Sequence, residues 1–142
     1  MKKKEVRKKV FTSINMGMFY GHCFVSAGNT PKEIHDYLKK DKTTKDWADA
    51  FEVIKLKIQM NDPHCQVDTV VTTEGDKVIK YYFLYIKNPF GFTDQEMCEL
   101  AHECVHLCQH VLPDYLDRNK EMECEAYLHT HLMSQCLKTF RS

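Results

Sequence analysis

The stretch that decides the fold of this chain is Glu99-Leu100-Ala101-His102-Glu103-Cys104-Val105-His106-Leu107. On an α-helix, residues four apart project from the same face, so the imidazoles of His102 and His106 can both reach one Zn²⁺ at about 2.0 to 2.1 Å. Glu103 is poorly placed to bind the same ion, but its carboxylate can lie beside a water molecule and accept its proton. The stretch therefore predicts a metal-binding helix that also carries a candidate general base.

The residues around this stretch favour a buried helix. Thr93 is a suitable N-cap, and the run Asp94-Gln95-Glu96 that follows it is typical of a helix start. The apolar face that such a helix needs is supplied by Leu100, Val105, Leu107 and Val111. The alternative is an ordinary amphipathic helix whose histidines are solvated or satisfied in a core, and the motif alone leaves it open.

A third ligand has to come from elsewhere in the chain, because a catalytic zinc site keeps three protein ligands. Leu112-Pro113-Asp114 should end the first helix, and residues from Asn119 to Leu128 predict a second one. This second segment carries three acidic candidates, which are Glu121, Glu123 and Glu125.

We predict that Glu123 is the third ligand. In helical geometry it lies on the side opposite to Glu121 and Glu125. The less polar stripe that it shares consists of Ala126, Tyr127 and Thr130. We expect this stripe to face the first helix, because the small Ala126, one turn after Glu123, would let the two helices approach closely. Glu121 is the second choice, and the third possibility is that all three glutamates are charges on a solvated face.

Two other side chains extend the stripe of the histidine pair. Cys98 stands four residues before His102, and His110 stands four residues after His106, so each is a weaker candidate for the metal. The chain has seven cysteines, an odd number with no Cys-x-x-Cys pair, which argues against a disulfide framework and a structural zinc site. We expect reduced thiols, and we expect small buried hydrophobic roles for Cys104, Cys108 and Cys124.

His102-Glu103-x-x-His106 followed by Glu123-x-x-Ala126-Tyr127 resembles the minimal gluzincin pattern. The chain more closely resembles a family of small phage- and prophage-encoded proteins classed as zinc metallopeptidases. The segments that carry this resemblance are Tyr82-Phe83-Leu84-Tyr85-Ile86-Lys87-Asn88, Leu100-Ala101-His102-Glu103-Cys104-Val105-His106 and Glu123-Cys124-Glu125-Ala126-Tyr127-Leu128. Phe19-Tyr20-Gly21-His22-Cys23-Phe24-Val25-Ser26-Ala27-Gly28 is similar to that family's opening strand. The resemblance implies that His102, His106 and Glu123 bind zinc and that Glu103 is the general base.

Tyr127 marks a departure from the better-studied gluzincins, which often carry an acidic residue four positions after the ligand glutamate. That residue orients a ligand histidine, and a tyrosine hydroxyl can still hydrogen-bond but lacks the charge. Tyr127 is also one of four donors near the second helix that are candidates to stabilise an oxyanion. The other three are Tyr115, His129 and His131, and the sequence does not choose among them.

Composition sets limits on the class of protein. At 142 residues the chain is long enough for one domain with one core. Its 20 basic and 20 acidic residues give a net charge of zero, which offers no argument for nucleic acid or an anionic membrane as partner. Lysines and Arg7 crowd residues 1–9, which we interpret as a solvated basic arm in front of a single domain at 10–142. The alternative is a tail that binds nucleic acid or a partner, although no aromatic residue is interleaved in the run.

No targeting or membrane segment is expected. Val10 to Asn15 is too polar for the apolar part of a signal peptide. The longest strongly apolar run, from Tyr81 to Ile86, is far below the roughly 20 residues that span a bilayer. We therefore expect a cytoplasmic protein, in the cytosol of a bacterium or of a phage-infected host.

The rest of the chain predicts both strands and helices. Strands are expected over Val10–Asn15 and Met18–Ser26, followed by a helix from Pro31 to Lys39 with Thr30 as N-cap. The residues of that helix that should face the core are Ile34, Tyr37 and Leu38. A second helix is predicted where apolar residues recur at helical spacing, at Trp47, Ala50, Phe51, Ile54 and Ile58.

A hairpin should follow, with arms over Gln66–Thr72 and Lys77–Lys87 and a turn at residues 73–76. Its second arm contains Tyr81 to Ile86, where aromatic and aliphatic residues alternate. This arm is either an edge strand beside the metal, able to pair with an extended peptide, or a plain core strand.

Together these features predict a small single-domain zincin-like α+β fold, in which a short, mainly antiparallel sheet packs on the His-Glu-x-x-His helix and on a second, glutamate-bearing helix. The function that fits is a zinc-dependent peptidase that hydrolyses a protein or peptide with a metal-activated water and Glu103 as base. One alternative is a catalytically idle zinc-binding protein that docks a host or phage partner. The other is a metal-free α+β interaction module.

Overall fold

The computed structural model describes residues 7–17, 21–114 and 122–142, except for the side chains of 114 and 122–124. Four strands form one sheet in this part of the chain: β1 (Val10–Asn15), β2 (His22–Ala27), β3 (Cys65–Glu74) and β4 (Lys77–Ile86). Their order is β1-β2-β4-β3, with antiparallel pairing of β1 to β2 and of β3 to β4, and parallel pairing of β2 to β4. The predicted first strand is confirmed. The second strand was predicted from residue 18, but the structure starts it at His22, and residues 18–20 lie outside the described part of the chain.

The predicted hairpin is β3 and β4, joined through Gly75, whose φ of +61° suits glycine in a tight turn. β4 lies between β2 and β3, and all residues from Tyr81 to Ile86 are buried. The expectation of an edge strand at Tyr81 to Ile86 is therefore wrong, and the alternative of a core strand is confirmed. β3 is the outer strand on this side of the sheet.

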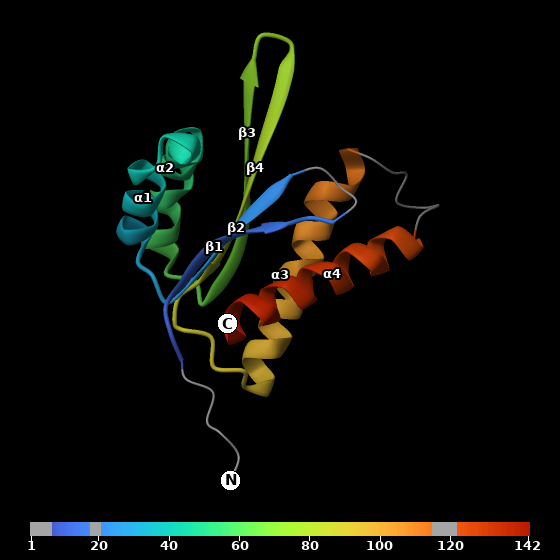
Figure 1. Ribbon diagram of the computed structural model, residues 1–142. Helices are drawn as coiled ribbons and strands as arrows, with labels where there is room; N and C mark the ends of the chain where they lie inside the picture. Colours follow the sequence, from blue (N-terminus) through green and yellow to red (C-terminus); the bar gives the residue numbers. More distant parts are fainter. Residues whose placement is uncertain (1–6, 18–20, 115–121) are drawn as a thin grey trace.

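The alternation of side chains along β4 divides the core into two layers. Tyr82, Leu84 and Ile86 belong to the cluster on one face of the sheet, whereas Tyr81 and Phe83 belong to the cluster on the other. The second cluster is completed by α1 (Pro31–Lys40) and α2 (Lys45–Asn61), and the first by α3 (Asp94–Val111) and α4 (Met122–Arg141). Figure 1 shows these helix pairs on opposite sides of the sheet, with the β3–β4 hairpin projecting beyond them.

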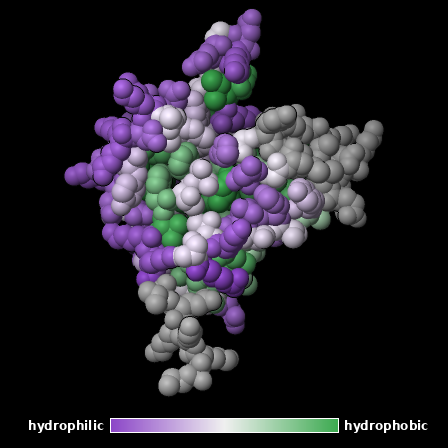
Figure 2. Space-filling model, in the orientation of Figure 1, coloured by the Kyte–Doolittle hydropathy of each residue, from purple (hydrophilic) through white to green (hydrophobic). Residues whose placement is uncertain are grey.

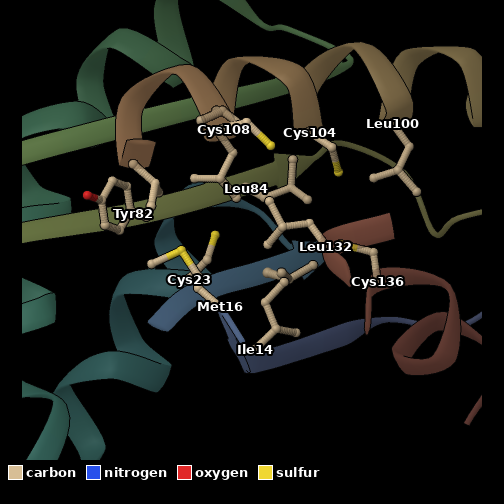
Figure 3. Packing of buried hydrophobic residues seen from close by; sticks show 14 of the residues in the cluster. Ile14, Met16, Cys23, Tyr82, Leu84, Leu100, Cys104, Cys108, Leu132 and Cys136 are labelled. Atoms are coloured by element: carbon tan, nitrogen blue, oxygen red, sulfur yellow. The ribbon is translucent and has the colours of Figure 1, made fainter. Parts of the chain in front are cut away.

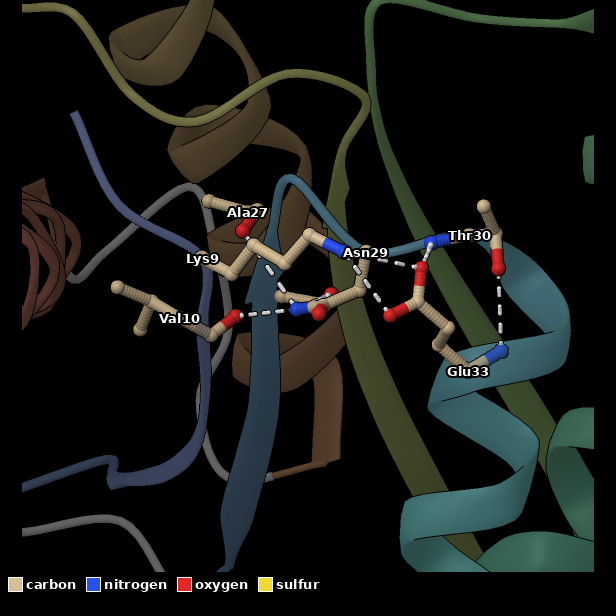
Figure 4. Close-up of polar contacts among 7 residues, drawn as sticks. Lys9, Val10, Ala27, Asn29, Thr30 and Glu33 are labelled. Carbon is tan, nitrogen blue, oxygen red and sulfur yellow. Dashed lines mark hydrogen bonds and ion pairs between the residues drawn. The ribbon is translucent and has the colours of Figure 1, made fainter.

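α1 begins where the sequence predicts, at a Thr30 N-cap that forms a capping box with Glu33. Asn29, directly before it, is buried and donates hydrogen bonds from Nδ2 to the carbonyl oxygen of Val10 and to Oγ of Ser26 (Figure 4). These bonds join the start of α1 to both β1 and β2. The expectation that Tyr37 faces the core is wrong: it is 40% exposed, and its ring stacks on Phe11 of β1, an outer strand of the sheet.

The predicted positions of α2 face the sheet, with Trp47 partly buried and the other four residues buried. The helix is longer than the apolar spacing indicates and ends at Asn61, and the C-cap residue Asp62 adopts a left-handed conformation with φ of +46°. Hydrophilic residues cover much of the surface in Figure 2, with a small hydrophobic patch on the projecting hairpin, where Val71 and Val78 are exposed.

α3 is capped as predicted, since the Thr93 side chain accepts a hydrogen bond from the backbone N–H of Glu96. Leu100, Leu107 and Val111 are buried as expected, but Val105 is 38% exposed because its side of the helix is only partly covered by α4. Figure 3 shows the underside of α3, where Cys104 and Cys108 pack among apolar side chains of β4 and α4. Both cysteines therefore have the buried role that was predicted, while the side chain of Cys124 lies outside the description.

The fold class is mixed α+β, with four α-helices and one four-stranded sheet in the described residues. No helix among those residues is sufficiently long and apolar to cross a bilayer. A short 3₁₀ turn, Leu112–Asp114, ends α3 at the predicted position.

Candidate metal centre

His102 and His106 project from the same side of α3, as the spacing predicts. Their Nε2 atoms are 3.0 Å apart, and the two rings are nearly perpendicular, at 86°. Two nitrogen ligands at about 2.0 to 2.1 Å from a tetrahedral zinc ion are about 3.3 Å apart, so a small side-chain movement suffices to place both on one ion. His102 is exposed and His106 half-buried, which leaves the pair accessible from solvent.

Gln109 fixes the proton on the ring of His106. Its Oε1 atom lies 3.1 Å from Nδ1 of His106, and a carboxamide oxygen can only accept a hydrogen bond. Nδ1 of a neutral His106 ring therefore carries the proton, and Nε2 keeps the lone pair that a metal ligand requires. A partner of this kind also orients a ligand imidazole.

Glu103 points to the outer strand of the sheet. Its Oε2 atom accepts a hydrogen bond from the backbone N–H of Val67 on β3 at 2.9 Å. The carboxylate is half-buried and lines a pocket of about 380 Å³ together with His102. The candidate base is thus held at the wall of a pocket that also contains one of the histidines.

The two preferred candidates for a third ligand, Glu123 and Glu121, have side chains that lie outside the description. Among the side chains that are described, no group of three His, Cys, Asp or Glu is placed to hold a metal ion. The two imidazole nitrogens that the structure does describe lie within hydrogen-bond distance of each other, and nitrogen donors of this type, four residues apart on a helix, fit two ligand positions of a zinc site.

The orientation of α4 differs from the expectation. Ala126, Tyr127 and Thr130, predicted to face the first helix, are all exposed, although Ala126 does line a hollow between α4 and α3. The side that faces α3 carries Glu125 and His129 as well as Ala126. His129 donates a hydrogen bond from Nε2 to the carbonyl oxygen of Ala101 at 3.1 Å.

This difference follows from the apolar stripe of α4. The helix presents Leu128, Leu132, Cys136 and Phe140 to the core below it. Burial of these residues fixes the rotation of the helix, and Glu125 and His129 then fall on the flank beside α3. Glu125, Ala126 and His129 line a hollow of about 330 Å³ with Val105 and Cys108 of α3.

Three of the four candidate oxyanion donors belong to the described residues, and they fall into two groups. Tyr127 stacks on His131, with ring centroids 6.1 Å apart, and His131 donates to the carbonyl oxygen of Asn15 at the end of β1. The Nε2–H group of His129 is already bonded to the carbonyl oxygen of Ala101. Tyr115 lies outside the described residues. The contacts of Tyr127 and His131 thus lie towards β1 and the turn at Gly17.

His110 is bound to the sheet. Its Nδ1 atom lies 2.5 Å from Oγ1 of Thr69 on β3. Burial lowers the pKa of His110 below its usual range, and the neighbouring His106 lowers it further. This nitrogen is therefore engaged away from the histidine pair.

Cys98 is exposed and lines the same pocket as His102, so it remains a weaker candidate for the metal.

Two partners of the site, Gln109 and the backbone N–H of Val67, were not predicted from the sequence. The sequence does contain a signal for Gln109, because this residue lies three positions after His106, a spacing that permits a side-chain contact on a helix. The sequence contains no such signal for Val67, because this residue is far from Glu103 in the chain.

Comparisons with protein-family models, curated proteins and solved structures find no match for this chain.

Proposed function

We propose that this protein is a zinc-dependent peptidase in which His102, His106 and Glu123 hold the metal and Glu103 is the general base. The observation that carries the proposal is the approach of the two Nε2 atoms to 3.0 Å on one side of α3. Gln109 supports it, because its contact leaves the lone pair of His106 Nε2 available to a metal. The resemblance of the motif to gluzincins points the same way.

Bound zinc would act as a Lewis acid towards a peptide carbonyl and a water molecule. Glu103 would take a proton from the water whose oxygen forms the new bond to the carbonyl carbon. It would then give this proton to the amine nitrogen as the carbon–nitrogen bond breaks. The backbone N–H of Val67, bonded to one carboxylate oxygen, keeps the side chain directed along the pocket wall while the other oxygen serves as the base.

The architecture is compatible with a zincin-like domain. The sheet packs on α3 and α4, and its outer strand β3 lies beside α3. We propose a protein or peptide as the substrate and a reducing cytosol, of a bacterium or an infected host, as the place of action. The buried thiols of Cys23, Cys104, Cys108 and Cys136 fit such a compartment.

A zinc-binding but catalytically idle protein that docks a partner is the second candidate. The observation that favours it is the commitment of His129 and His131 to main-chain carbonyls, which removes two of the four expected oxyanion donors. In this case the pocket beside His102 would receive a protein segment without cleaving it.

The test compares wild-type protein with Glu103→Gln. Each purified protein is analysed for zinc by mass spectrometry and then incubated with a denatured protein mixture, whose new amino termini are counted. We expect about one zinc per chain in both proteins, and we expect hydrolysis to fall by at least about 100-fold in Glu103→Gln.

Cleavage that is unchanged in Glu103→Gln would overturn the assignment of the base. Zinc in both proteins without hydrolysis by either would favour the idle protein. Wild-type protein without zinc, whose stability also ignores a chelator, would contradict both proposals.

A further inference from the structure

The pocket at the histidine pair continues along α3 into a second hollow. The first, of about 380 Å³, is lined by His102 and Glu103, and the second, of about 290 Å³, is lined by Arg7 and Glu96. Both are also lined by His64, Gln95 and Glu99. These shared residues show that the hollows adjoin at Glu99, one helical turn before the proposed metal ligand. Their volumes are near the lower limit for ligand pockets and suit individual side chains of a peptide.

The two acidic residues of this groove differ in their partners. Glu96 is compensated: Oε1 lies 3.6 Å from Nη2 of Arg7, and Oε2 accepts a hydrogen bond from the backbone N–H of Gly91. Glu99 is half-buried and accepts a hydrogen bond from the neutral side chain of Gln95 at 3.1 Å. Within the described part of the chain, no cation is paired with the Glu99 carboxylate.

The carboxylates that line the pocket near Glu99 create a negative electrostatic environment for other groups in it. The half-buried thiol of Cys65 lines the same pocket, and its pKa is raised by burial, then by Glu103, Cys104 and Glu99 in that order. A cation would be stabilised by the same carboxylates that disfavour a thiolate. If the cation pairs with Glu99, the hydrogen bond between Glu103 and the backbone N–H of Val67 can stay in place.

We propose that Glu99 receives the lysine or arginine side chain of a peptide, so that the protein acts beside a basic residue of its substrate. This inference rests on the proposed peptidase function for the chemistry, but the recognition step is separate from it. A carboxylate at the mouth of a pocket forms a charge-assisted hydrogen bond with an ammonium or guanidinium group. Such bonds are worth about 1.5 to 3 kcal/mol, which corresponds to roughly 10- to 100-fold in affinity.

The experiment measures binding without turnover. Short blocked peptides that differ only in a central lysine, norleucine or glutamate are titrated into full-length Glu103→Gln protein and followed by fluorescence anisotropy. We expect the lysine peptide to bind about tenfold more tightly than the norleucine peptide. Adding Glu99→Gln should remove this difference, and adding Glu99→Lys should make the glutamate peptide the preferred one.

Glu74→Gln is the matched control, because it removes the same charge from the exposed end of the hairpin. It should keep the preference for lysine. Thermal unfolding and zinc content of every variant show whether the domain and the metal centre are intact. Equal binding of the lysine and norleucine peptides, absence of binding, or a preference that survives Glu99→Gln would each overturn the inference.

The same peptides separate this inference from the proposed function. If wild-type protein holds zinc and hydrolyses peptides without preference for lysine or arginine, the specificity of Glu99 is wrong and the peptidase stands. If the lysine peptide binds through Glu99 but wild-type protein cleaves none of the peptides, the pocket is supported and the peptidase proposal fails.

Discussion

The carboxylate of Glu103 and the backbone N–H of Val67 form a hydrogen bond of 2.9 Å between α3 and the outer strand β3. The two residues are 36 positions apart in the chain. The candidate base is therefore positioned by the sheet and not only by the helix that carries it. A strand N–H at this edge also gains an acceptor that no neighbouring strand provides.

Replacement of Glu103 should separate this structural role from the chemical one. Glutamine retains an oxygen that can accept from Val67, so we expect Glu103→Gln to unfold with nearly wild-type stability. Glu103→Ala leaves the half-buried N–H without its protein acceptor, and we expect a loss of about 1 kcal/mol. Urea unfolding of the metal-free proteins measures both values. Equal stability of the alanine and glutamine variants would show that the bond contributes nothing to folding.

The identity of the third ligand is tested on α4. We expect His102→Ala, His106→Ala and Glu123→Gln each to lose most of the bound zinc, because each removes one of three protein ligands. Glu125→Gln should retain it, since the described contacts of Glu125 are with the hollow between α3 and α4. Metal analysis after dialysis against a zinc buffer gives the stoichiometry. Zinc retained by Glu123→Gln but lost from Glu125→Gln would reverse the assignment.

Gln109 provides a test of the orientation of His106. We expect Gln109→Leu to weaken zinc affinity by about 10- to 100-fold while the stoichiometry at saturating zinc stays unchanged. The reason is that Nδ1 of His106 loses the acceptor that holds its proton and its ring angle. Competition with a fluorescent zinc chelator measures the affinity. Gln109→Glu, which keeps an acceptor at the same place, should bind zinc at least as tightly as wild type.

Thiol labelling tests the packing beneath α3. Cys98 is exposed and should react first with iodoacetamide, whereas the half-buried Cys65 should react more slowly because its pKa is raised by burial. Burial, then the neighbouring Cys104, raises the pKa of Cys108 to about 12, so this thiol should resist the reagent at pH 8. Cys23, Cys104 and Cys136, which are also buried, should behave like Cys108. Mass spectrometry of the labelled peptides gives each rate.

Unfolded protein in urea is the control for this experiment, because all of these thiols should then react at similar rates. Labelling of any of the four buried cysteines as fast as Cys98 in folded protein would contradict their packing in the core between the sheet, α3 and α4. The rate at Cys98 with and without bound zinc also tests its candidacy as a ligand, since a metal-bound thiolate would be protected.

Much of the secondary structure could be predicted because its causes are local. Thr30 and Thr93 cap their helices through contacts within three residues, and the apolar spacing of α2 and α3 indicates which positions face the sheet. The same holds for the histidine pair, since four residues on a helix bring two side chains to one side wherever the helix lies. The errors at Tyr37 and Val105 have a different origin. Both are apolar positions at the margin of a packed face, where exposure depends on what the neighbouring elements cover.

The sequence by itself determined the α3 motif, its helix caps and the approach of His102 to His106, because these depend only on the spacing of residues along one helix. Tertiary structure decided that β4 is central, that Val67 holds Glu103, and that α4 turns Glu125 and His129 to α3. The physical reason is that burial of large apolar stripes sets the rotation and order of the elements. The polar side chains then occupy whichever flanks that packing leaves to them.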